Sequence, residues 1–176
     1  MTRRWIFGIL AVLWMSFVFW QSHLPAVKSS GESSDIVEIV QDVFFPKWDR
    51  LDHETYLELM SNLTFLVRKA AHFLEFLLLG VLIGGFVGSF EKAGYGGKLL
   101  SGAAFGVILG CLDEFHQHFV DGRVMEVFDM AVDGAGALIG VFLSLGVTAM
   151  ALETRFRHGK NRPEETPTPD QHITTQ

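Results

Sequence analysis

The chain has 176 residues, of which 49% are hydrophobic, 12% aromatic and only 19% charged. This length predicts one domain, and a charged content below the roughly 25% of soluble domains indicates a membrane protein. The formal net charge of −6 argues against nucleic acid as a partner, and the single cysteine, Cys111, excludes a disulfide framework or a zinc ribbon.

Four apolar stretches predict membrane-spanning helices, at residues 5–20, 70–90, 99–120 and 125–152. A helical span needs roughly 20 predominantly apolar residues, and the last three stretches reach that length by including polar residues at one end. The first stretch also fits a cleaved signal peptide because Arg3 and Arg4 precede it. No A-x-A-like cleavage site follows, which favours an uncleaved span. The predicted fold is all-α and polytopic, with four transmembrane helices.

The expected organisation has four parts. Residues 1–24 form the first span, residues 25–67 an extracytoplasmic amphipathic segment, residues 68–152 a three-span core and residues 153–176 a disordered cytoplasmic tail. Within the second part, apolar residues recur at helical spacing over 36–44 and 51–67, which predicts one or two helices on the outer surface. These helices would either pack over the bundle as a cap or close over a polar site as a lid.

Basic residues predict the orientation. They gather before the first span, in the connection at 91–98 and in the tail after Leu152, so the positive-inside rule places both termini in the cytoplasm. The expected location is a bacterial plasma membrane, with the lipid bilayer as the surrounding partner. Arg68 and Lys69 are exceptions, because they flank the outer end of the second span. Basic residues there predict local acidic partners.

Polar residues mark the outer ends of the second, third and fourth spans in this topology. His72 and Glu75 share one helix face, as do Asp129 and Asp133. Charged groups at this depth are costly, so they should face the bundle interior and pair with one another. The sequence therefore predicts one functional cluster, built from three helices, whose members are Arg68, Lys69, His72, Glu75, Asp113, Glu114, Gln117, Arg123, Asp129 and Asp133.

Three blocks of this sequence carry a family resemblance. They are Arg68-Lys69-x-x-His72-x-x-Glu75-Phe76-x-x-Leu79-Gly80, Asp113-Glu114-x-x-Gln117-x-Phe119-x-x-Gly122-Arg123 and Asp129-x-x-x-Asp133-x-x-Gly136-x-x-x-Gly140. Together they resemble the VanZ-like membrane proteins, a family named for an accessory teicoplanin-resistance protein of glycopeptide-resistance clusters. The resemblance covers roughly residues 65–145. It implies a four-span bacterial membrane protein and, for the namesake, reduced sensitivity to a lipoglycopeptide.

Two positions depart from the usual family pattern. Asp121 stands where proline commonly precedes the Gly-Arg pair, which loosens the turn before Arg123, and Asp133 stands where asparagine is often found. The second change adds a negative charge to the cluster. The resemblance implies no established reaction, so it does not decide whether the protein is an enzyme.

The residue types leave several functions open. Ion pairs could simply lock the helices together, with Arg68 or Lys69 bound to Asp113 or Glu114, and Arg123 bound to Asp129. A proton-coupled transporter is disfavoured because ionisable residues stop at the outer half of the spans. An enzyme is the main alternative, acting on a lipid or wall precursor by acid–base or metal chemistry. Its candidate metal ligands are His72, Glu75, His116 and Asp129.

The favoured hypothesis is a binding site for an amphiphile with an anionic head group. Arginine holds phosphate or carboxylate in a bidentate manner, and the bilayer supplies an apolar surface beside the cluster. A lipid, a lipid-linked wall precursor or a lipoglycopeptide would fit this description. Such a protein would lower sensitivity to lipoglycopeptides such as teicoplanin.

Overall fold

The computed structural model describes residues 2–23, 36–45, 48–123 and 125–160, and over these residues it contains helices and no strand. The four long helices are α1 (Thr2–Ser22), α3 (His53–Gly88), α4 (Tyr95–Gln117) and α5 (Val127–Lys160). Residues 36–44 are also helical, and a short 3-10 helix, η1, spans Trp48–Arg50. Each long helix contains a segment long and apolar enough to cross a membrane. The predicted all-α, four-span fold is confirmed.

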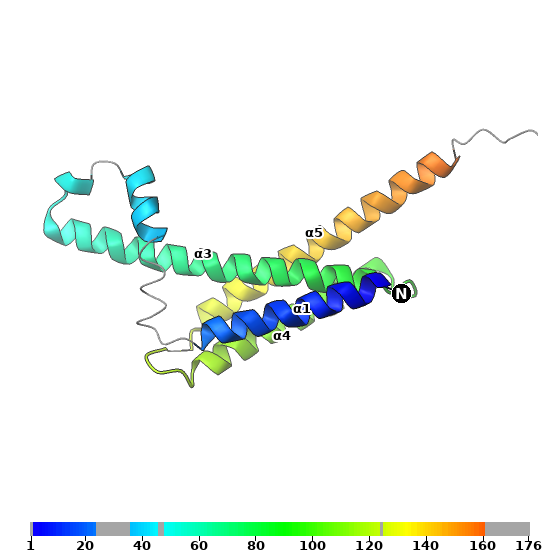
Figure 1. Cartoon of the computed structure of the whole chain (residues 1–176), viewed down its shortest axis with the longest axis horizontal. Helices are drawn as coiled ribbons and strands as arrows, with labels where there is room; N and C mark the ends of the chain where they lie inside the picture. Colours follow the sequence, from blue (N-terminus) through cyan, green and yellow to red (C-terminus); the bar gives the residue numbers. More distant parts are fainter. Residues whose placement is uncertain (1, 24–35, 46–47, 124, 161–176) are drawn as a thin grey trace, which may run out of the picture.

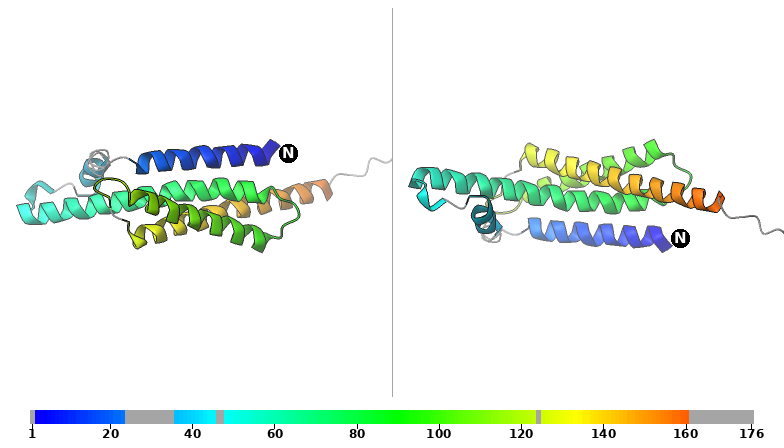
Figure 2. Two further views of the ribbon diagram at one scale, coloured as in Figure 1. Left: turned by 90° about the horizontal axis from the view of Figure 1, so that it is seen from below. Right: turned by 90° about the horizontal axis from the view of Figure 1, so that it is seen from above.

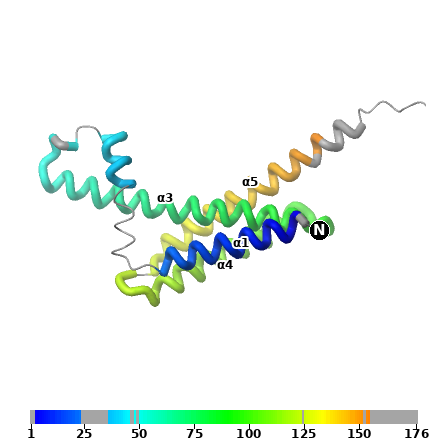
Figure 3. The backbone as a smooth tube through the Cα atoms, viewed as in Figure 1, coloured from blue at the N-terminus to red at the C-terminus, as the bar shows by residue number. Residues whose placement is uncertain are grey.

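The four long helices form an antiparallel bundle around α3. This helix packs against α1, α4 and α5, and its most extensive contact is with α5 (Figure 1). The two views in Figure 2 place α1 on one side of α3 and α5 on the other. The backbone trace in Figure 3 shows that the end of α1, the end of α4 and the start of α5 lie at the same end of the bundle. We call this the polar end.

Helix α3 is longer than the predicted second span. It begins at His53, behind the N-cap Asp52, whose side chain accepts a hydrogen bond from the Thr55 backbone N–H at 3.1 Å. The hydrogen bonds from Thr55 hold the pKa of the Asp52 carboxyl below its usual range. The helix then runs without a break to Gly88, so the expected boundary at residues 67/68 is not a helix boundary. Its N-terminal part extends past α1 and α4, with the helical residues 36–44 beside it (Figure 1).

Helix α5 also exceeds its predicted length. It continues to Lys160, so residues 153–160, which were expected to be disordered, are helical. The remainder of the expected tail, 161–176, lies outside the described residues, as do residues 24–35.

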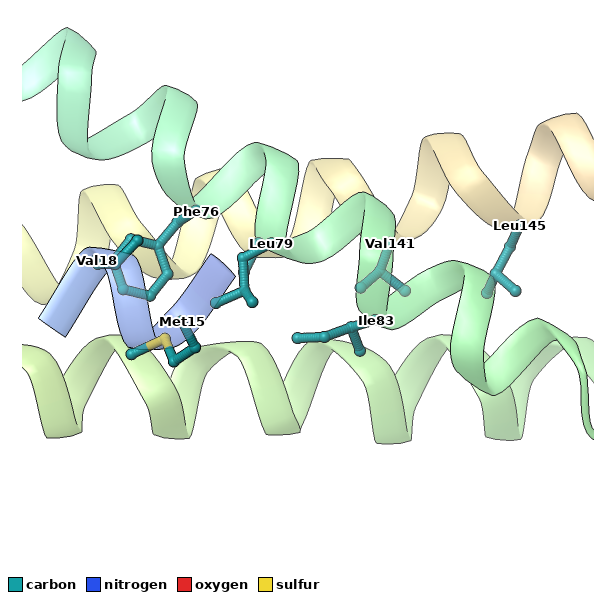
Figure 4. Close-up of a cluster of buried hydrophobic side chains, with 8 residues drawn as sticks. Met15, Val18, Phe76, Leu79, Ile83, Val141 and Leu145 are labelled. Carbon is teal, nitrogen blue, oxygen red and sulfur yellow. The ribbon is translucent and has the colours of Figure 1, made fainter. Parts of the chain in front are cut away.

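Apolar side chains from α1, α3 and α5 fill the centre of the bundle (Figure 4). Phe76, Leu79 and Ile83 of α3 are almost fully buried between Val18 of α1 and Val141 of α5. Lipid tails are as apolar as these side chains, so the association of the helices depends on close van der Waals packing rather than on the hydrophobic effect. A tight fit between α3 and α5 is therefore the main requirement of the fold.

Glycines provide that tight fit. A Cβ placed on Gly140 of α5 would collide with the backbone carbonyl of Leu77, and one on Gly80 of α3 would collide with the backbone of Ala137. At the polar end, a Cβ on Gly110 of α4 would lie 2.9 Å from the Cβ of Asp133. The absence of side chains at these positions lets α3, α4 and α5 bring their polar groups together.

Candidate functional site

Two neighbouring groups of polar side chains occupy the polar end of the bundle. Both draw on the middle of α3 and the start of α5, and the second also includes the last turns of α4. We call the first the ion-pair cluster, and its members are Arg68, Lys69, Glu126 and Asp129. We call the second the His–carboxylate cluster, and its members are His72, Asp113, Glu114 and Asp133.

Lys69 is the centre of the ion-pair cluster. It is only 6% exposed, and its ammonium binds Oε2 of Glu126 at 2.8 Å and also the carboxylate of Asp129. The rings of Phe65 and Phe128 lie 4.9 and 5.6 Å from the ammonium, within range of a cation–π interaction. Arg68 is more exposed and lies 3.6 Å from Oε1 of Glu126. These pairings correct the predicted ones: the lysine partner is Asp129, and Asp113 and Glu114 belong to the other cluster.

Glu126 links this cluster to the aqueous surface. The Lys69 hydrogen bond and the positive charges of Lys69 and Arg68 lower the pKa of the Glu126 carboxyl. Its backbone carbonyl accepts the first hydrogen bonds of α5, from Asp129 and Met130. The Glu126 backbone N–H donates to Oε2 of Glu114 at 3.1 Å, which fixes the start of α5 against the end of α4.

The His–carboxylate cluster is completely enclosed. Asp113, Glu114 and Asp133 have no exposed surface, and His72 is 7% exposed. One potential ligand atom from each of the four lies within 4.8 Å of the other three. His72 Nδ1 is 3.4 Å from Oδ1 of Asp133. Three buried carboxylates thus share one imidazole, and the nearest lysine is already engaged in the ion-pair cluster.

Hydrogen bonds hold Asp113 in place from two directions. Its Oδ2 accepts from the Ser22 hydroxyl of α1 at 2.9 Å and from Nε2 of Gln117 at 2.8 Å. Gln117 is in turn oriented by Arg123, whose Nη1 donates to Gln117 Oε1 at 2.9 Å. The sequence had suggested Asp129 as a partner of Arg123, and Gln117 is a partner that it did not suggest.

Arg123 reaches back over the cluster because of a tight turn. The Arg123 backbone N–H bonds the carbonyl of Val120 at 3.1 Å, and Gly122 within the turn has a φ of 77°. Glycine adopts this left-handed conformation without the steric cost of a side chain. Burial lowers the pKa of the Arg123 guanidinium, and the charges of Asp113 and Glu114 oppose that shift. An arginine stays protonated at physiological pH, so Arg123 adds positive charge above the carboxylates.

The comparison with known proteins agrees with this architecture. The family model for VanZ/LLP1 matches residues 7–149, which include both clusters and most of α1. The chain belongs to the VanZ/LLP1 family. No curated protein and no solved structure matches the chain.

Of the four metal ligands expected from the sequence of this VanZ/LLP1 protein, the His–carboxylate cluster contains only His72. Asp129 pairs with Lys69, and His116 stacks against His23, with their ring centres 5.6 Å apart. Glu75 lies one turn from His72 on α3 and interacts electrostatically with His72, Asp113 and Arg123. The cluster recruits instead Asp113, Glu114 and Asp133 from the two other helices.

Sequence reasoning missed the contribution of α1 to this VanZ/LLP1 site. Ser22 is 5% exposed and bonds Asp113 from a helix that was expected only to anchor the chain. The signal was weak, because a serine at the end of an apolar stretch normally marks the end of a span. The expected depth of Ser22 in the membrane was the informative feature, because the positive-inside topology places residue 22 beside the polar ends of the other spans.

An apolar groove runs along the membrane-spanning part of the VanZ/LLP1 bundle, between α1, α3 and α4. It consists of two adjoining hollows, of about 220 and 440 Å³, which share Ala11, Val12, Ile83 and Phe105 as lining residues. The smaller hollow extends to Phe19, whose ring meets His116 edge-on at 5.7 Å. We call this the α1–α4 groove. It leads from the apolar half of the bundle to the polar end.

Proposed function

We propose that this VanZ/LLP1 protein binds a membrane amphiphile, with the acyl chain in the α1–α4 groove and an anionic head group at the polar end. The observation that carries the proposal is the position of the groove. Its walls are almost entirely apolar, and its upper boundary at Phe19 lies one turn below Ser22, the hydroxyl that bonds Asp113. An apolar slot ending at a polar site matches the two halves of an amphiphile.

Arginines at the polar end support the anionic character of the head group. The Arg68 side chain is 43% exposed, and its ion pair with Glu126 is long at 3.6 Å. Its guanidinium can therefore turn toward a phosphate or carboxylate and bind it in a bidentate manner. Arg123 is half-buried on the turn between α4 and α5, on the approach to the His–carboxylate cluster.

The distribution of basic residues supports an orientation in which the head group binds on the outer side of the membrane. With both termini in the cytoplasm, the polar end faces the exterior of a bacterial plasma membrane. Lipids, lipid-linked wall precursors and lipoglycopeptides are all present at that surface. We therefore propose that the protein lowers sensitivity to lipoglycopeptides such as teicoplanin by engaging one of these amphiphiles.

A groove-filling variant tests the binding. Ala11 lines both hollows, so Ala11→Phe should occupy the space for the acyl chain. We expect native mass spectrometry of the full chain in detergent to detect bound phosphatidylglycerol or undecaprenyl phosphate on the wild type. Ala11→Phe should reduce that binding at least tenfold. The matched control is Ala135→Phe, which adds the same ring to the exposed face of α5.

A second pair of variants tests the head group. Arg68→Ala should weaken binding of the anionic lipid and leave phosphatidylcholine binding unchanged, whereas Arg50→Ala, an exposed arginine of η1, should change neither. Equal binding of the lipid to wild type, Ala11→Phe and Ala135→Phe would contradict the proposal. So would a preference for phosphatidylcholine over both anionic lipids.

A cellular experiment separates binding from catalysis. A deletion strain is complemented with wild type, Arg123→Ala, Asp129→Asn or Glu75→Gln, and teicoplanin and dalbavancin susceptibility and lipid composition are measured. The binding proposal predicts that the variants lose protection while lipid composition stays constant. Unchanged susceptibility with altered lipids would instead support a lipid- or precursor-modifying enzyme, for which the buried His–carboxylate cluster offers acid–base groups.

A further inference from the structure

The His–carboxylate cluster contains more negative charge than its surroundings neutralise. Asp113, Glu114 and Asp133 are fully buried, and the ammonium of Lys69 is committed to Glu126 and Asp129. Removing an ionised carboxylate from water costs several kcal/mol unless it is paired or binds a cation. His72 can offset only one of the three charges. The cluster therefore requires protons or a bound cation.

The hydrogen bonds of the carboxylates distinguish between neutralisation by protons and neutralisation by a bound cation. Asp113 uses Oδ2 for its hydrogen bonds with Ser22 and Gln117, and Glu114 uses Oε2 for the Glu126 backbone N–H. The second oxygen of each group, Oδ1 of Asp113 and Oε1 of Glu114, is buried and has no hydrogen-bond partner among the described residues. Both oxygens of Asp133 also lack a hydrogen bond there, and Oδ1 has only the 3.4 Å ionic contact with His72 Nδ1 among the described residues. Each anchored carboxylate thus keeps one buried oxygen available for a further ligand.

This pattern is how proteins hold metal ligands. One oxygen is fixed by outer hydrogen bonds and the other is directed at the ion. Ligand atoms lie about 2.0–2.6 Å from a bound divalent ion, so opposite ligands are about 4–5 Å apart. The four potential ligand atoms, all within 4.8 Å of one another, already have that spacing.

We propose that His72, Asp113, Glu114 and Asp133 bind one divalent transition-metal ion at the polar end of the bundle. One imidazole nitrogen with three carboxylate oxygens suits Mn²⁺, Fe²⁺ or Zn²⁺ better than Ca²⁺, which prefers oxygen ligands alone. Two positive charges would leave the centre close to neutral once Arg123 is counted. Binding of the metal ion does not require an amphiphile, so this proposal does not depend on the function proposed above.

Metal binding to the full-length protein in detergent is the direct test. The protein is stripped with EDTA, dialysed against Mn²⁺ or Zn²⁺, and analysed for metal content and thermal unfolding. We expect about one ion per chain and a higher Tm, since a ligand that binds only the folded state stabilises it. Asp133→Asn should lower the affinity at least tenfold. Glu126→Gln, a matched change outside the cluster, should retain wild-type affinity.

Two further results make the test independent of folding defects. Asp113→Asn keeps an amide oxygen for the hydrogen bonds from Ser22 and Gln117 while replacing the inward oxygen, so it should fold and lose the metal. Without metal, Asp133→Asn should melt at or above the temperature of the stripped wild type, because it removes one of three buried negative charges that share a single imidazole. The proposal is overturned if neither ion binds the wild type stoichiometrically, or if Asp113→Asn and Glu126→Gln bind it equally.

Discussion

The ion-pair cluster and the His–carboxylate cluster lie one helical turn apart along α3 and α5, yet only the first has its negative charges balanced by positive ones. Lys69 precedes His72 by three residues on α3, and Asp129 precedes Asp133 by four on α5. In the first cluster, Lys69 and Arg68 together balance the charges of Glu126 and Asp129. In the second, three fully buried carboxylates face a single imidazole.

We propose that this difference separates a structural role from a functional one. The ion-pair cluster has the partners that helix locking requires, so its contacts account for its residues. The His–carboxylate cluster is poorly explained by locking, because unpaired buried charges destabilise a folded protein. We propose that a ligand compensates these charges. A metal ion would bind inside the cluster, and an amphiphile would bind beside it.

Among the tests of this comparison, replacing Lys69 should have the largest effect on the stability of the protein. Lys69→Ala leaves Asp129, which is 4% exposed, as an uncompensated buried charge. Breaking such a pair costs about 3–5 kcal/mol, so we expect a large drop in Tm and in the yield of folded protein. Thermal unfolding in detergent, monitored by size-exclusion chromatography, measures both. Lys69→Met combined with Asp129→Asn should recover most of the loss.

Arg68→Ala is the control for that experiment. Its ion pair is exposed and long, so the cost should stay below about 1 kcal/mol. If Lys69→Ala and Arg68→Ala lower Tm equally, the ion-pair cluster does not lock the helices in the way described.

Forcing α4 away from α5 should have an intermediate effect, concentrated on the second cluster. The Cβ of Gly110→Ala would lie 2.9 Å from the Cβ of Asp133, so the two helices must shift. Overpacking of this kind costs about 1–3 kcal/mol. We expect a moderately lower Tm together with weaker Mn²⁺ binding. Gly146→Ala, where a Cβ meets nothing within 4 Å, should leave both unchanged; unaltered Mn²⁺ binding by Gly110→Ala would show that the helix spacing is not critical.

Acidification should have the smallest effect, and it should act through the ion-pair cluster. The Lys69 hydrogen bond lowers the pKa of Glu126 from its ordinary value of 4.5 in the folded protein. A depressed carboxyl pKa contributes stability above the unfolded value, and that contribution is lost as pH falls through the folded value. Lys69 and Arg68 of α3 face this carboxylate, and it is 42% exposed, so the effect should be below about 1 kcal/mol.

The measurement compares Tm for wild type and Glu126→Gln between pH 7 and pH 3. The wild type should be slightly more stable at neutral pH, and the difference should shrink as pH falls below about 4.5 and vanish below the lowered pKa of folded Glu126. A difference that grows on acidification would mean that the Glu126 pKa is raised rather than lowered.

The sequence predicted the fold class because the bilayer imposes strong rules. Spans need long apolar stretches, and ionisable residues such as His72 and Asp133 stand out within them. Helical periodicity also indicated which of these residues share a face. The boundaries were less predictable, since the 36-residue α3 continues through the expected limit at residue 67 with no change in its backbone.

The partners of each charge were decided only by the tertiary structure. Counting residues could not show whether Lys69 binds Asp113 or Asp129, because the sequence places both at the outer ends of the spans and the choice depends on the rotation of α4 and α5 about α3. That rotation is set by close contacts at Gly80, Gly110 and Gly140. The sequence by itself determined a four-helix membrane protein with a polar end. The packing of glycine-lined helices determined which carboxylates are paired and which are left facing one another.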